Sequence, residues 1–283
     1  MPNLKVEKAE RLGLCFGVRR AMTLLTEAVR KHGRIETLGP LAHNRLLVEA
    51  LAGLGVEPVH GLDQVRGRIL AITTHGTSPA VLSEIRARRM DVIDTTCPIV
   101  RRAQKTAGEL AGAGYDVIIF GEAEHSEVRG LLGWTGGKGI ATSDIDRLDD
   151  LPRPKARLAL ISQTTQTPST FFGFAEQLID RLGPKMEEIR LVNTLCQVTC
   201  LQQEAAVRLA RRNELVIVIG GSNSANVRHL LETCSPLVET HLIESAEELE
   251  ESWLAGRQRI GITAGASTPD EAVEELTARL MSL

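Results

Sequence analysis

Short apolar segments alternate along the chain with longer segments in which apolar residues recur at helical spacing. The most apolar segments, Val117 to Phe120 and Leu215 to Ile219, have the length of buried strands. A helix that crosses a membrane needs about 18 or more consecutive apolar residues, and the sequence contains no such run. Because strands that alternate with helices are typical of parallel sheets, the pattern predicts an α/β fold.

The same pattern occurs three times, and each copy begins at a cysteine. A short extended segment changes into a long helical segment at three cysteines: Cys15, Cys97 and Cys196. A polar loop follows in each copy, and at the same offset of 28 positions from the cysteine it carries a polar side chain: His43, His125 or Ser224. The chain is therefore organised as an internal threefold repeat.

Each copy contains a second polar loop, which leads into a further helix. These loops contain His75, Thr165 and Ser267, and each is followed by a hydroxyl residue and a proline: Ser78-Pro79, Thr167-Pro168 and Thr268-Pro269. We expect the hydroxyl residue to be the N-cap and the proline the first helical residue. Each repeat then runs cysteine, helix, strand, polar loop, helix, strand, polar loop, helix and a strand that leads to the next cysteine.

The repeats predict three α/β domains with parallel sheets. Their expected bounds are 15–96, 97–195 and 196–283, and residues 1–14 form a strand segment that leads to Cys15. The second repeat is longer than the first, and most of the additional residues lie between Trp134 and Pro154. Glycines, acidic residues and prolines in this connection indicate an irregular surface excursion.

Composition and charge exclude several classes of function. With 43% hydrophobic residues and a formal net charge of -3, the chain has the composition of a globular protein. Nucleic-acid-binding proteins usually show a basic excess and stacking aromatics, whereas here 33 basic residues stand against 36 acidic ones and aromatic residues make up 3%. The polar N-terminus lacks a signal-peptide core. We expect a cytoplasmic protein without nucleic-acid or membrane partners, acting as a monomer.

The five cysteines indicate metal chemistry rather than disulfides. A cytoplasmic chain of 283 residues can bury a large core without cross-links. Cys200 and Cys234 have no counterpart in the other repeats, so we expect core thiols at both positions. Core packing does not explain a thiol at the equivalent position of three repeats. Cys15, Cys97 and Cys196 are therefore candidate metal ligands.

Two kinds of metal centre are compatible with three thiolates. Zinc could be held by the three cysteines and a histidine, although zinc ligands usually come as two closely spaced pairs. A 4Fe-4S cluster usually has four cysteine ligands, so three would leave one iron open to a substrate. If the repeats surround a pseudo-threefold axis, the three cysteines meet at its centre.

Polar side chains would surround this centre, because ligands of parallel sheets bind where strands end and helices begin. The candidate residues are His43, His75, His125, Thr165, Ser224, Asn226 and Ser267. Glu127, two residues after His125, is the nearest obvious proton donor.

Taken in order along the chain, these motifs resemble the family of 4-hydroxy-3-methylbut-2-enyl diphosphate reductases. The resemblance extends from about residue 12 to about residue 270. The motifs are Gly13-Leu14-Cys15-Phe16-Gly17-Val18, Gly39-Pro40-Leu41-Ala42-His43-Asn44, Thr74-His75-Gly76, Asp94-Thr95-Thr96-Cys97-Pro98, His125-Ser126-Glu127-Val128, Ser162-Gln163-Thr164-Thr165, Cys196 with Thr199 and Gln203-Glu204-Ala205, Asn223-Ser224-Ala225-Asn226 and Thr263-Ala264-Gly265-Ala266-Ser267.

The resemblance implies a reductive dehydroxylation of 4-hydroxy-3-methylbut-2-enyl diphosphate to isopentenyl diphosphate and dimethylallyl diphosphate. This reaction is the last step of the non-mevalonate isoprenoid pathway. The resemblance also implies one 4Fe-4S cluster per chain on Cys15, Cys97 and Cys196, with one open iron and a 3Fe-4S form as an oxidation product. A ferredoxin or flavodoxin would donate the electrons.

The resemblance further assigns residue roles. It implies that Glu127 delivers protons and that Thr199 lies near the proton path. Its substrate-contacting positions fall on His43, His75, His125, Thr165, Ser224, Ala225, Asn226 and Ser267. Ala225 stands where the family commonly has serine, so only its backbone N–H could serve the diphosphate. Phe16 and Ser222 stand where a small residue and a lysine are common.

Two functions of other classes stay open. A zinc hydrolase with three cysteines and a histidine would be colourless, whereas an iron-sulfur protein is brown. A non-catalytic sensor that binds a cluster would leave an allylic diphosphate unconsumed under reducing conditions.

Overall fold

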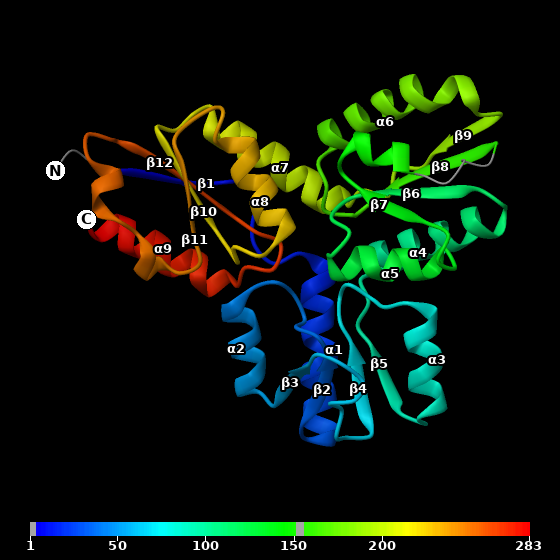
Figure 1. The fold of residues 1–283 in the computed structure, drawn as a ribbon. Coiled ribbons are helices and arrows are strands. Elements are labelled where there is room, and N and C mark those ends of the chain that lie inside the picture. Colours follow the sequence, from blue (N-terminus) through cyan, green and yellow to red (C-terminus); the bar gives the residue numbers. More distant parts are fainter. Residues whose placement is uncertain (1–3, 151–155) are drawn as a thin grey trace. The chain divides into compact units, whose positions relative to one another are not determined.

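The fold consists of three four-stranded parallel sheets. Helices alternate with the strands along the chain, as can be followed in Figure 1. The computed structural model describes residues 4–150 and 156–283. Every strand pair with a recorded register in this part of the chain is parallel. The predicted α/β class with parallel sheets is therefore confirmed.

All three sheets have the same strand order. The first sheet has the order β3-β2-β4-β5, the second β7-β6-β8-β9, and the third β11-β10-β12-β1. The strands of the first sheet are β2 (Ile35–Leu38), β3 (Val56–Val59), β4 (Ile69–Ile72) and β5 (Asp91–Asp94). Those of the second are β6 (Asp116–Phe120), β7 (Ile140–Thr142), β8 (Arg157–Ser162) and β9 (Glu188–Leu191). Those of the third are β10 (Leu215–Ile219), β11 (Thr240–Ile243), β12 (Arg259–Ala264) and β1 (Lys5–Lys8).

The N-terminal strand β1 completes the third sheet, since it pairs with β12 and supplies the strand that β5 and β9 supply to the other two. The repeat of the sequence thus reappears as a repeat of sheet topology.

The helices follow the three cysteines and the polar loops, as the sequence predicts. They are α1 (Phe16–His32), α2 (Arg45–Gly53), α3 (Pro79–Ala87), α4 (Pro98–Gly112), α5 (Ser126–Trp134), α6 (Pro168–Leu182), α7 (Gln197–Ala210), α8 (Ala225–Cys234) and α9 (Asp270–Ser282), with short 3₁₀ segments at η1 (Ile145–Asp150), η2 (Gly183–Lys185), η3 (Ala246–Glu248) and η4 (Glu251–Leu254).

Two of the three predicted hydroxyl N-caps are confirmed, and the third is wrong. Ser78 accepts a hydrogen bond from the backbone of Val81, and Thr167 accepts one from Thr170. Helix α9 instead begins at Asp270, and its N-cap is Pro269. The Thr268 hydroxyl donates to the carbonyl of Ile219 at 2.9 Å, so this side chain binds the end of β10.

One strand in each sheet is missing from the predicted repeat. These strands, β3, β7 and β11, lie at sheet edges, where a strand pairs on one side and needs no continuous apolar run. β3 contains a proline, which sheets tolerate at edges. The expected irregular excursion between Trp134 and Pro154 therefore contains β7, which pairs with β6. Residues 151–155 of that connection lie outside the described residues.

The described chain forms two compact units. The first comprises residues 4–34, 40–57 and 197–283, and the second comprises residues 35–39, 58–150 and 156–196. Each unit has its own apolar core. The predicted division into three repeat domains stays a prediction.

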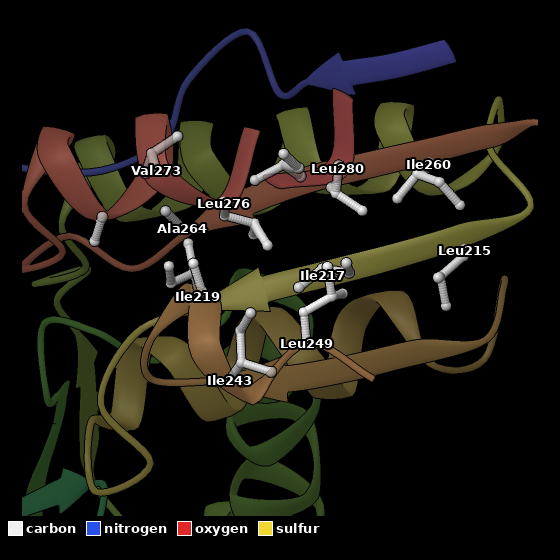
Figure 2. Packing of buried hydrophobic residues seen from close by; sticks show 13 residues of the cluster. Leu215, Ile217, Ile219, Ile243, Leu249, Ile260, Ala264, Val273, Leu276 and Leu280 are labelled. Atoms are coloured by element: carbon white, nitrogen blue, oxygen red, sulfur yellow. The ribbon is translucent and has the colours of Figure 1, made fainter. Parts of the chain in front are cut away.

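The core of the first unit fills both faces of the third sheet. On one face, α9 packs through Val273, Leu276 and Leu280 against the strands β10 and β12, as Figure 2 shows. On the other face, Val216 and Val218 of β10 pack with the apolar residues of α7 and α8, including Ala206, Leu209, Leu230 and Cys234. The third sheet is thus a rigid layer that holds the loops at its carboxyl edge.

The core of the second unit places α4 and α5 against the second sheet. Ala103 and Ala107 of α4 and Val128 and Leu131 of α5 are buried with residues of β6 and β8. None of the helices within residues 4–150 and 156–283 combines the length and apolar character that crossing a bilayer requires.

Candidate active site

The three cysteines of the repeat occupy equivalent positions in the structure. Cys15 and Cys97 are the N-cap residues of α1 and α4, and α7 begins directly after Cys196. Each cysteine donates its backbone N–H to a carbonyl of the second polar loop of a repeat: Cys15 to Ala266 at 2.9 Å, Cys97 to Thr74 at 3.0 Å and Cys196 to Thr164 at 2.8 Å. The accepting residue directly precedes Ser267, His75 or Thr165. One backbone pattern therefore couples each cysteine to a predicted ligand loop.

The surroundings of the three thiols fit metal ligation. None of the five cysteines, all of which lie among the described residues, forms a disulfide. The first turns of α1, α4 and α7 contain no acidic residue. The three thiols therefore lie where the partial positive charge of a helix N-terminal end is not offset by a carboxylate of the same turn.

The other two cysteines have different surroundings. Cys234 is completely buried among apolar residues of α7, α8 and β10, and burial raises the pKa of its thiol to about 11. It is therefore a core thiol, as predicted. Cys200 lies on α7, is half-buried and is flanked by apolar Leu201.

The predicted site residues are distributed over both units. The second unit contains Cys97, Cys196, His75, His125, Glu127 and Thr165. The first unit contains Cys15, His43, Thr199, Ser224, Ala225, Asn226 and Ser267. That all of them meet around one centre stays a prediction.

In the second unit, His125 and Glu127 are organised by the start of α5. His125 is the N-cap, and its Nδ1 accepts a hydrogen bond from the backbone N–H of Glu127 at 3.2 Å. A neutral imidazole that accepts at Nδ1 carries its proton on Nε2 and can donate there. The ring of His75 lies edge-on to that of His125, with centroids 5.4 Å apart. The two histidines that the sequence placed in different repeats are thus brought together.

The carboxyl group of Glu127 is buried and held by one residue. Its exposed fraction is 2%, and its oxygens accept hydrogen bonds from the backbone N–H of Thr164 at 2.7 Å and from the Thr164 hydroxyl at 2.9 Å. Burial raises the pKa of Glu127 from 4.5 to about 7, because the loss of water outweighs the two hydrogen bonds that favour the ionised form. Glu127 can therefore carry and release a proton near neutral pH.

Thr164 is a site residue that sequence reasoning missed. The sequence singled out Thr165 and Thr199, whereas the contact to the carboxylate comes from Thr164. The Thr165 hydroxyl instead accepts from the side chain of Gln163 at 3.2 Å, and Thr199 is buried on α7 in the other unit. The Thr164-Thr165 doublet is the available sequence signal, but which threonine faces Glu127 depends on the loop conformation.

The raised pKa of Glu127 predicts a pH-dependent cost to stability. Below about pH 4.5 the folded and unfolded states both bind this proton. Between pH 4.5 and pH 7 the unfolded state ionises while the folded state keeps the proton, so the folded state loses stability across this window and the loss is complete above pH 7. As the pH rises from 5 to 8, we expect the lead of Glu127→Gln over the unsubstituted protein in free energy of unfolding to grow by about 2–3 kcal/mol. Urea denaturation at both pH values measures this gap, and an equal gap at both would contradict it.

In the first unit, the loop between β10 and α8 lies against the His43 loop. A Cβ atom on Gly221 would lie 2.3 Å from the carbonyl oxygen of His43, so only glycine permits this approach of the two backbones. Ser224 is the N-cap of α8, and its side chain forms no cap hydrogen bond. Asn44, next to His43, caps α2 by accepting from the backbone of Leu47. The loop that carries His43 is thus held by its contact with Gly221 and by the cap hydrogen bond of Asn44.

Comparison with known proteins extends over nearly the whole chain. The sequence profile of the LytB protein family matches residues 6–281. A protein of Dehalococcoides mccartyi named 4-hydroxy-3-methylbut-2-enyl diphosphate reductase is 46% identical over 277 residues, which cover 98% of each chain.

Two solved structures are similar over most of the chain. One, described as (E)-4-hydroxy-3-methyl-but-2-enyl diphosphate reductase, the terminal enzyme of the non-mevalonate pathway, is 36% identical, has a TM-score of 0.73 and covers 99% of this chain and 100% of its own. The other, the E-1-hydroxy-2-methyl-but-2-enyl-4-diphosphate reductase of Plasmodium falciparum, is 23% identical, has a TM-score of 0.91 and covers 98% of this chain and 88% of its own, which supports the fold. Because the profile and the Dehalococcoides relative both match the chain from end to end, the chain belongs to the LytB protein family.

Proposed function

We propose that the chain catalyses the reductive dehydroxylation of 4-hydroxy-3-methylbut-2-enyl diphosphate to isopentenyl and dimethylallyl diphosphate. The observation that carries the proposal is Glu127, a buried carboxyl with a pKa of about 7 whose backbone N–H binds His125, the ring that His75 meets edge-on. The full-length relatives named as this reductase support the substrate and the pathway step.

A 4Fe-4S cluster on Cys15, Cys97 and Cys196 is part of the proposal. Three thiols at the starts of helices whose first turns contain no acidic residue fit such a cluster, and no fourth cysteine has an equivalent position. When bound, a cluster with three cysteine ligands supplies electrons and one iron with Lewis-acid character that the protein leaves open. A 3Fe-4S form is the expected oxidation product.

The protein itself binds the diphosphate and moves protons. In the overall reaction the C–O bond breaks, a C–H bond forms, and two electrons and two protons are consumed as the oxygen leaves as water. Glu127 delivers a proton to the leaving oxygen, and Thr199 lies near this path. Neutral donors suit an anion in a dry site, and we assign the diphosphate to His43, His75, His125, Thr165, Ser224, Asn226, Ser267 and the backbone N–H of Ala225.

The proposal includes three repeat domains, residues 15–96, 97–195 and 196–283, around a pseudo-threefold axis, preceded by the segment 1–14, which leads to Cys15. The common strand order and the matching N–H bonds of the three cysteines support it. We further propose that a ferredoxin or flavodoxin donates the electrons and that the protein acts as a monomer. We expect a cytoplasmic location, where thiols stay reduced.

Anaerobic turnover is the direct test. Purified under exclusion of oxygen, the protein should be brown, contain about four iron and four sulfide per chain, and convert the allylic diphosphate when a reductant is supplied. A colourless zinc protein would contradict the cofactor. A brown protein that leaves the substrate unchanged would contradict the enzymatic function.

A further inference from the structure

Several side chains of the first unit bury polar atoms that have no hydrogen-bond partner among the described residues, Gln202 and His229 among them. In three residues every polar side-chain atom is unpartnered: both amide atoms of Gln203 and of Asn226, and the hydroxyl of Thr263. The exposed fractions of these three residues are 5%, 3% and 0%. Buried polar groups without a partner are costly and rare in native proteins, so these three call for a functional explanation.

The strand register shows which face of the third sheet Thr263 occupies. Thr263 pairs with Val218, and Gly261, two residues earlier, pairs with Val216. A Cβ atom on Gly261 would lie 2.8 Å from the side chain of Leu209, so Gly261 faces α7. Because alternate residues of a strand share a face, Thr263 faces α7 as well.

The two amides continue the same layer. Gln203 lies one turn before Ala206 on α7, and Asn226 lies one turn before Leu230 on α8. Ala206 and Leu230 pack together with Val218 in one apolar cluster. Helix α8 starts where β10 ends, and the later residues of α7 pack on the same strands. The side chains of Gln203, Asn226 and Thr263 therefore extend this cluster toward the carboxyl edge of the sheet.

The start of α8 suits an anion at this edge. Its first turn contains no acidic residue, and the N-cap side chain forms no cap hydrogen bond. The N–H groups of the first turn are therefore open to a phosphate group. Asn226 lies in this turn and is the residue whose amide would meet the phosphate first.

An inventory of donors and acceptors connects the three groups. If Nδ2 of Asn226 donates to a phosphate oxygen, its Oδ1 points away from the anion and needs a donor. Nε2 of Gln203 can supply that donor, and Oε1 of Gln203 can in turn accept from the Thr263 hydroxyl. We propose that Gln203 and Thr263 are positioning residues, which orient the Asn226 amide toward the diphosphate through a chain of hydrogen bonds that closes when the ligand binds. This inference rests on the proposed function, since it takes Asn226 to contact the diphosphate.

A double-mutant cycle on binding of inorganic diphosphate tests the inference. The anaerobic holoenzyme and its variants are titrated by calorimetry, so the readout does not depend on turnover. We expect Asn226→Ala and Gln203→Leu each to weaken binding about tenfold, as the loss of one hydrogen bond to a charged ligand does. In the Asn226→Ala background, Gln203→Leu should have almost no further effect, because Gln203 acts through Asn226.

Stability and a matched pair of variants separate positioning from a purely structural role. Gln203→Leu removes an unsatisfied amide, so the Tm of the ligand-free protein should stay equal or rise. Thr263→Val, which loses only the hydroxyl, should weaken diphosphate binding, and Thr263→Ser should restore it. If Gln203→Leu does not fold, Thr263→Val takes its place in the cycle.

The opposite results would overturn the inference. Unchanged binding in Gln203→Leu, or the same fold loss in both backgrounds, would show that Gln203 does not act through Asn226. If the unsubstituted holoenzyme fails to bind inorganic diphosphate, the proposed ligand chemistry fails and this inference with it. Binding by that protein with independent effects of the variants overturns the inference alone.

Discussion

Replacement of Glu127 by glutamine should lower kcat by about 100-fold or more, which is the usual contribution of general acid catalysis. Glutamine keeps the shape of the side chain and can still accept the N–H of Thr164, but it has no proton to release. Diphosphate binding and the brown colour should remain. In the unsubstituted protein, kcat should fall as the pH rises through about 7, because the proposed role of Glu127 as an acid requires its protonated form.

Glu124→Gln is the matched control for this kinetic prediction. Glu124 lies three residues earlier, in the loop before α5, is exposed and forms an ion pair with Arg129. Its replacement should leave kcat near that of the unsubstituted protein. A Glu127→Gln variant with a raised KM and an unchanged kcat would show that Glu127 binds substrate and that the proton has another source.

Replacement of Cys15, Cys97 or Cys196 by serine should abolish or cripple both the visible absorbance and the turnover. Each of these thiols lies at the start of a helix, and the three residues share the same backbone hydrogen-bond pattern. We therefore expect that the other two thiols cannot replace the one that is lost. A cluster left with two thiolates loses iron readily, because thiolate ligands hold the metal. Iron and sulfide analysis after anaerobic purification measures the loss.

Cys200→Ser and Cys234→Ala are the controls. Cys234 is buried in an apolar cluster, and Cys200 has no counterpart in the other repeats, where arginines form ion pairs instead: Arg19 with Asp270 and Arg101 with Asp94. Both variants should keep their colour, and Cys234→Ala should lose some stability through the cavity it leaves. Loss of colour in Cys200→Ser would make that residue a further ligand.

The sequence by itself determined the repeat, the class of fold and the residues at the ends of strands. The spacing of apolar residues indicates which side of a strand or helix is buried, so the threefold pattern predicted parallel sheets. The three sheets indeed share one strand order. The position of the cysteines at helix starts could be predicted because the change from strand to helix is visible in the local sequence. Edge strands such as β3 and β7 were missed, since a strand that pairs on one side needs little apolar character.

Only the tertiary structure decided which polar side chains are dry and what they contact. A glutamate in the first turn of a helix is by default solvated, and Glu127 becomes an acid near neutral pH only because the loop of Thr164 closes over it. The choice of Thr164 over Thr165, and the unpartnered amides of Gln203 and Asn226, likewise depend on residues distant in the chain. The burial of a polar side chain and the choice of its hydrogen-bond partners depend on all residues that surround it in space, and no local pattern of residues encodes them.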